Sequence, residues 1–132
     1  MPRRETIVAV LVGWTLFVWT TRIGNIWRTH TTSTADKVGS TALALSFTAL
    51  AALVLVGWLQ RRPWLRRALL ALTAWTGAVW AERSVAIVTD HRGAGFVAVH
   101  AVLAVVSVTL CAAALRRVPS AERDLSPVGR GE

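Results

Sequence analysis

The stretch WTLFVWTTRIGNIWRTH (residues 14–30) has a second version, WTGAVWAERSVAIVTDH (residues 75–91), further along the chain. Trp, Thr, Val, Trp, Arg, Ile and His coincide between the two, each at an offset of 61 positions. The offset holds without gaps from residue 2 to residue 55, where 14 of 54 aligned pairs are identical. A composition biased toward Ala, Val, Leu, Arg and Thr gives about one match in ten by chance. We therefore predict a tandem duplication.

The hydropathy pattern predicts that each repeat crosses a membrane twice. The 132-residue chain is 54% hydrophobic, whereas a soluble domain is usually about 45–50% apolar. About 20 apolar residues cross the hydrocarbon layer as a helix, and all four prolines lie outside the apolar blocks. Sustained period-two alternation, which a membrane β-barrel requires, is not seen. We expect an all-α integral membrane protein, a four-helix transmembrane bundle, with spans at about 6–27, 38–59, 68–88 and 95–115.

The duplication divides the chain into three segments. Residues 1–61 form the first two-helix repeat and residues 62–116 form the second. Because each repeat crosses twice, both have the same orientation, so a pseudo-twofold axis along the membrane normal is expected. Residues 117–132 are polar, and we expect them to be a disordered cytoplasmic tail.

The distribution of basic residues predicts the orientation. The side that carries both termini and the connection between the two repeats holds ten of them: Arg3, Arg4, Arg61, Arg62, Arg66, Arg67, Arg116, Arg117, Arg123 and Arg130. The opposite side holds Arg28, Lys37 and Arg92. The positive-inside rule places the richer side in the cytoplasm. The net charge of +8 is thus explained by orientation and anionic lipid, and we expect no nucleic-acid partner.

The matched positions of the first span lie on one helical face. They are 11, 14, 15, 18, 19, 22 and 26, which cover an arc of about 140° with Arg22 near its centre. This face and its copy define the candidate binding residues, which are Arg22, Arg83, Glu82, Trp19, Trp80, Trp14 and Trp75.

Three interpretations of the repeated arginines remain open. Arg22 and Arg83 snorkel to the outer headgroups beside Trp19 and Trp80, or they converge on an anionic lipid, an anionic solute or an acidic residue of a partner. In the third interpretation, Glu82 forms a structural ion pair with Arg22 that ties the repeats together.

Catalytic and metal-binding patterns are not seen in the sequence. Cys111 is the only cysteine, which excludes an intrachain disulfide and CxxC chemistry. His30, His91 and His100 have no dense ligand spacing. The chain has no glycine-rich phosphate loop and no nucleophile elbow. We therefore predict no enzyme activity, no metal site and no cofactor.

Size and composition lead to two functional hypotheses. The first is a non-enzymatic accessory, assembly or scaffolding component that binds a membrane partner or lipid. The alternative is a small homodimeric transporter or channel for an anionic solute. Fourteen arginines against one lysine, with abundant Ala, Val and Leu, are typical of a GC-rich bacterial genome, so we expect the bacterial cytoplasmic membrane.

Overall fold

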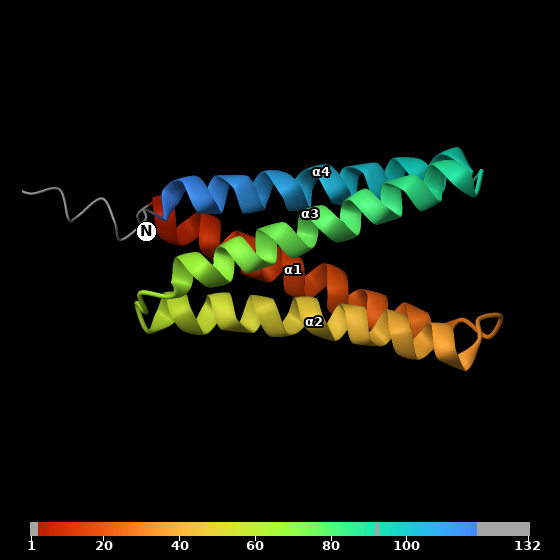
Figure 1. The fold of residues 1–132 in the computed structure, drawn as a ribbon, viewed down its shortest axis with the longest axis horizontal. Helices are drawn as coiled ribbons and strands as arrows, with labels where there is room; N and C mark the ends of the chain where they lie inside the picture. Colours follow the sequence, from red (N-terminus) through yellow and green to blue (C-terminus); the bar gives the residue numbers. More distant parts are fainter. Residues whose placement is uncertain (1–2, 92, 119–132) are drawn as a thin grey trace, which may run out of the picture.

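Four α-helices make up the fold (Figure 1). The computed structural model describes residues 3–91 and 93–118, and over these ranges all regular structure is helical. The helices are α1 (Arg3–Arg28), α2 (Thr34–Leu59), α3 (Leu65–Thr89) and α4 (Ala94–Arg117). The predicted all-helical fold class is therefore confirmed.

Each helix is slightly longer than the apolar block that predicted it, because polar residues continue or cap its ends. At the start of α2, the Ser33 hydroxyl accepts a hydrogen bond from the Asp36 backbone N–H at 3.2 Å. The same hydroxyl donates to the Asp36 carboxylate at 2.6 Å. This cap satisfies one of the free N–H groups of the first turn. It lets α2 begin at Thr34, four residues before the predicted span.

The connection between α2 and α3 is a tight Schellman turn. The backbone N–H of Arg62 donates to the carbonyl of Gly57 at 2.8 Å, and that of Arg61 donates to Trp58 at 3.2 Å. Arg61 has a φ of 50°, in the left-handed region where glycine is usual. The tight turn makes α2 and α3 antiparallel neighbours.

Three of the helices in the described part of the chain are long and apolar enough to cross a membrane. They are α1, α2 and α4, with mean hydropathies of 1.6, 2.2 and 2.4 over their most apolar windows. The 25-residue α3 has sufficient length, but Glu82, Arg83 and several Thr, Trp and Gly residues lower its hydropathy. The chain thus has three helices with the composition of membrane spans, while α3 lacks an apolar window of this kind.

The helices form a square bundle in which α1 packs against α2 and α4, and α3 packs against the same two helices. Consecutive helices run in opposite directions, so α1 begins where α4 ends (Figure 1). The α2–α3 connection lies at this end too, which we call the basal end. The short connections α1–α2 and α3–α4 lie at the other end, which we call the distal end.

Tight packing is confined to the basal half of the bundle. In each helix the buried residues stop at about the middle. They fall within 8–19 in α1, 44–57 in α2, 65–80 in α3 and 107–114 in α4. Beyond these limits the α1–α2 hairpin and the α3–α4 hairpin diverge (Figure 1). The core therefore holds the hairpins together at one end and leaves them apart at the other.

The predicted disordered tail lies almost wholly outside the described residues. Its first two positions are described, and Arg117 there is the last residue of α4. Val118 follows and is buried against the core.

Candidate ligand-binding cleft

A cleft of about 490 Å³ lies between the two hairpins in the distal half. One wall comes from α1, the α1–α2 connection and the first two turns of α2. Trp80 of α3 and three residues of α4 form the other wall. The volume falls in the range of small-molecule sites, about 300–1,000 Å³. The divergence of the hairpins thus creates a space of ligand size.

Stacked aromatic rings close the cleft toward the basal end. Trp19 lines the cleft and stacks on Phe47 of α2, with ring centroids 4.0 Å apart and an interplanar angle of 7°. The Phe47 ring lies 6.3 Å from that of Trp75 on α3. These three rings bridge three helices at the level where the packed core begins.

Arg22 is the cation closest to this aromatic floor. It lines the cleft one turn beyond Trp19, and its Cζ lies 5.9 Å from the centre of the Trp19 ring, within cation–π range. Its Nε atom is buried and has no hydrogen-bond partner among the described residues. An anion in the cleft would supply the partner that this buried donor lacks.

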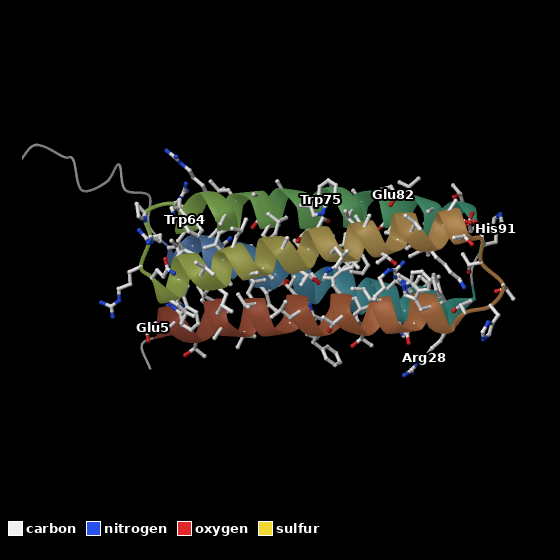
Figure 2. All side chains as sticks on the ribbon, turned by 90° about the horizontal axis from the view of Figure 1, so that it is seen from below. Glu5, Arg28, Trp64, Trp75, Glu82 and His91 are labelled. Carbon is white, nitrogen blue, oxygen red and sulfur yellow. The ribbon has the colours of Figure 1, made fainter. Side chains whose placement is uncertain are left out.

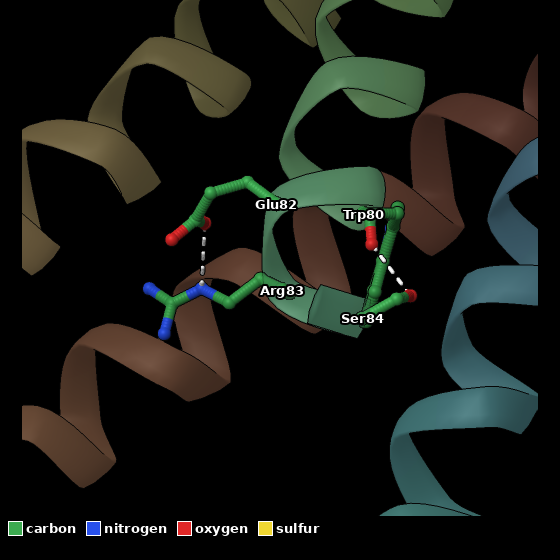
Figure 3. A network of polar contacts seen from close by, with 4 residues as sticks. All are labelled: Trp80, Glu82, Arg83 and Ser84. Atoms are coloured by element: carbon green, nitrogen blue, oxygen red, sulfur yellow. Dashed lines mark hydrogen bonds and ion pairs between the residues drawn. The ribbon is translucent and has the colours of Figure 1, made fainter. Parts of the chain in front are cut away.

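Glu82 contacts Arg83 on its own helix (Figure 3). The distance from Glu82 Oε2 to Arg83 Nε is 3.8 Å, and the two side chains are 70% and 34% exposed. Glu82 is exposed and lies toward the end of α3 that carries His91 (Figure 2). This ion pair therefore lies within one helix and does not connect α3 to α1.

Polar side chains of the α1–α2 hairpin surround the mouth of the cleft. Asn25 of α1 and Asp36, Lys37 and Ser40 of α2 all contribute to its lining. The Lys37 ammonium lies 6.0 Å from the ring centre of Trp27. Lys37 and Arg22 together give two positive charges against the single carboxylate of Asp36. The lining of the cleft is therefore cationic overall.

The opposite wall is mostly apolar. His100 of α4 makes an edge contact with Trp80, at 6.4 Å between ring centroids, and its Nδ1 lies 2.8 Å from the carbonyl oxygen of Phe96. Its ring is thus held by structural contacts. His30 and His91 are exposed in the distal connections. Within residues 3–91 and 93–118, no group of three His, Cys, Asp or Glu residues is placed to hold a metal ion.

Below the cleft, two hydrogen bonds join the hairpins in equivalent positions. Trp14 Nε1 of α1 donates to Ser107 Oγ of α4 at 3.0 Å. Trp75 Nε1 of α3 donates to Ser46 Oγ of α2 at 2.9 Å. Trp75 lies 61 positions after Trp14, and Ser46 lies 61 positions before Ser107. Trp14 and Trp75 therefore connect the hairpins and do not line the cleft.

The candidate residues thus separate into three groups. Trp19, Trp80 and Arg22 line the cleft. Arg83 lies outside the cleft lining and contacts the exposed Glu82. Trp14 and Trp75 form the interhelical hydrogen bonds. The alignment of the two similar segments of this chain did not identify the cleft residues of α2.

Comparison with known proteins finds no matching family model, no matching curated protein and no matching solved structure.

Proposed function

We propose that this chain is a small four-span integral membrane protein that binds a membrane partner or lipid in its distal cleft. In this proposal it is a non-enzymatic accessory, assembly or scaffolding component. It resides in a bacterial cytoplasmic membrane, with both termini inside and the cleft facing outward. The α3 helix completes the membrane-spanning bundle.

The observation that carries this proposal is the abrupt end of core packing at the level of Trp19 and Trp80. Helix packing in membranes depends on close van der Waals contact, so two hairpins that diverge forfeit that stabilisation. In the distal half, the divergence surrounds Arg22, a cation with an unpaired buried donor. Charged residues within membrane spans are expensive and usually functional. A ligand that fills the cleft supplies both the missing contacts and the missing partner for Arg22.

The repeated contacts support the tandem duplication within this proposal. Leu11 and Leu72 are both buried, as are Thr15 and Thr76. The Thr15 hydroxyl donates to the carbonyl of Leu11 and the Thr76 hydroxyl donates to that of Leu72, at 2.9 and 2.7 Å. The Trp14–Ser107 and Trp75–Ser46 hydrogen bonds are related by the same offset of 61 positions. A pseudo-twofold axis through the bundle accounts for all of these equivalences.

The charge distribution supports the orientation. Both α1 and α4 have their cytoplasmic ends at the basal end, where the exposed residues Arg61, Arg62 and Arg67 lie. Arg116 and Arg117 end α4 at this same end. The distal end has far fewer basic residues, so the positive-inside rule places it outside the cytoplasm.

A homodimeric transporter or channel for an anionic solute is the second candidate. One observation favours the transporter: the cleft opens the distal half of the bundle, while buried side chains fill the basal half. Such an arrangement matches one of the two states that alternating access requires. The space of one chain is small, so a pathway would need the second copy.

The test is the composition of the protein purified in a mild detergent from its own membrane. The proposal predicts that a lipid or a foreign subunit is retained in a fixed ratio by the wild type. Arg22→Gln should lose it, whereas Arg28→Gln should retain it, because Arg28 is exposed at the end of the same helix and lies outside the cleft lining. A clean homodimer that retains neither would contradict the accessory role and favour the transporter.

A further inference from the structure

We infer that the occupant of the cleft is a single anionic glycerophospholipid, with its phosphate on Arg22 and its hydroxyl-bearing headgroup among the polar residues of α2. This inference rests on the proposed function and names the class of ligand that the cleft takes.

The phosphate position follows from the chemistry of Arg22. A guanidinium presents its donors in a planar fork that fits two oxygens of a phosphate. The Nε donor of Arg22 is buried without a partner among the described residues. The Trp19 ring lies beside the guanidinium, and such contact leaves the in-plane donors free. Lys37 lines the same cleft and provides a second positive charge for the anion.

The headgroup position follows from the mixture of donors and acceptors at the mouth. Asn25 and Ser40 each supply both a donor and an acceptor, and the Asp36 carboxylate supplies acceptors only. A carboxylate next to a phosphate site repels a second negative charge but accepts hydrogen bonds from hydroxyl groups. This set therefore suits one phosphodiester charge followed by a polyol, as in phosphatidylglycerol, better than it suits a multiply charged anion.

The exposed residues of the lining indicate that the ligand is an amphiphile. Phe17 of α1 and Val99 of α4 both line the cleft, yet they are 64% and 57% exposed. The cleft therefore reaches the outer surface of the bundle between α1 and α4. In a bilayer this surface faces acyl chains. A lipid can place its headgroup inside while its chains leave sideways along Phe17, Val99 and Leu103, which a fully soluble anion has no need to do.

The test is lipid binding to the full chain in detergent, measured by native mass spectrometry as lipid is titrated. Phosphatidylglycerol should bind as one tight equivalent, and phosphatidylcholine of the same chain length should bind at least about tenfold more weakly. Arg22→Gln should weaken phosphatidylglycerol binding by about tenfold, because it removes a charge-assisted pair of hydrogen bonds. Arg28→Gln, the matched exposed arginine of α1, should change it by less than about threefold.

A second pair of variants tests the location without touching a charge. Leu103→Trp adds bulk to the cleft wall and should block the single tight equivalent. Val102→Trp puts the same ring on the exposed neighbour, outside the lining, and should leave binding intact. This pair decides the outcome if Arg22→Gln fails to fold.

The remaining outcomes overturn the inference in different ways. Equal phosphatidylglycerol binding by Arg22→Gln and Arg28→Gln, together with equal binding by the two Trp variants, would mean that lipid binds only around the bundle. Displacement of the lipid by millimolar sn-glycerol 3-phosphate or inorganic phosphate would identify a soluble phosphate site instead of a lipid site. If phosphatidylglycerol does not bind but a different partner is retained through Arg22, the inference fails while the proposed function stands. If nothing depends on Arg22, both fail.

Discussion

The interhelical hydrogen bonds of Trp14 and Trp75 give a quantitative prediction about what holds the two hairpins together. Ser107→Ala removes the acceptor of Trp14 Nε1, which lies 3.0 Å from Ser107 Oγ. Ser107 is buried, so the indole N–H gains no water in exchange. Interhelical hydrogen bonds in membrane proteins average about 0.6 kcal/mol, with a maximum of about 1.7. We expect a coupling free energy of about 1 kcal/mol between Ser107→Ala and Trp14→Phe.

The equivalent pair should show a smaller coupling. Trp75 is exposed, and Ser46 Oγ also donates to the carbonyl of Leu43 at 2.6 Å, so this serine has a second partner. We expect about 0.5 kcal/mol between Ser46→Ala and Trp75→Phe.

The assay is reversible unfolding in mixed detergent, followed by helical circular dichroism, with a double-mutant cycle for each pair. The crossed pair, Ser107→Ala with Trp75→Phe, shares no hydrogen bond and should be additive within about 0.3–0.5 kcal/mol. Ser84→Ala is the matched single control, because Ser84 donates only to the Trp80 carbonyl of its own helix at 2.7 Å (Figure 3). Coupling of the Trp14 pair no larger than that of the crossed pair would refute the account of hairpin attachment.

Three further predictions concern orientation, backbone strain and the arginines. A cysteine at Thr34 on a Cys111→Ser background should be labelled by an impermeant reagent from outside the cell; labelling from the cytoplasmic side alone would reverse the topology. Arg61→Gly should raise the free energy of unfolding by about 1 kcal/mol, because Arg61 has a positive φ that glycine adopts freely; a loss of stability would contradict the left-handed turn. Arg22→Gln and Arg83→Gln should be non-additive by more than about 0.5 kcal/mol in a double-mutant cycle if both act on the same anion; additivity would support independent snorkelling.

The four helices were predictable because membrane spans depend on local composition. Apolar blocks bounded by prolines and arginines placed every helix within a few residues of its observed bounds. The matched face of the first repeat was informative too: Leu11, Thr15 and Trp19 are buried, and so are their counterparts 61 positions later. These matched positions pack in the core, and their helical spacing in the sequence was sufficient to identify them.

The cleft was harder to predict for a physical reason. It depends on how far two hairpins diverge, which no single helix specifies. Its polar mouth is also confined to one repeat. Asp36, Lys37 and Ser40 correspond to Val97, Ala98 and Ala101 in the second copy, so a comparison that kept only matched residues discarded them. The signal that identifies these residues is a mismatch: a cluster of polar residues aligns with apolar residues 61 positions later.

The polarity of α3 follows from the same asymmetry. At the offset of 61 positions Glu82 aligns with Thr21 and Ser84 aligns with Ile23, so α3 carries polar residues where α1 carries a less polar or an apolar one. Glu82 remains largely exposed beside Arg83. An apolar-block criterion still predicts a helix there, but α3 has no window as apolar as those of α1, α2 and α4.

Photocrosslinking from the mouth of the cleft in native membranes tests the central claim most directly. A benzophenone amino acid replaces Phe17, which is exposed yet lines the cleft. The control position is Leu45, which is equally accessible on α2 but lies outside the lining. The account predicts a discrete adduct from position 17 that is lost when Arg22→Gln is added, retained with Arg28→Gln, and not formed from position 45. The same adducts from both positions, or an adduct at position 17 that does not depend on Arg22, would contradict the claim that the cleft is a binding site.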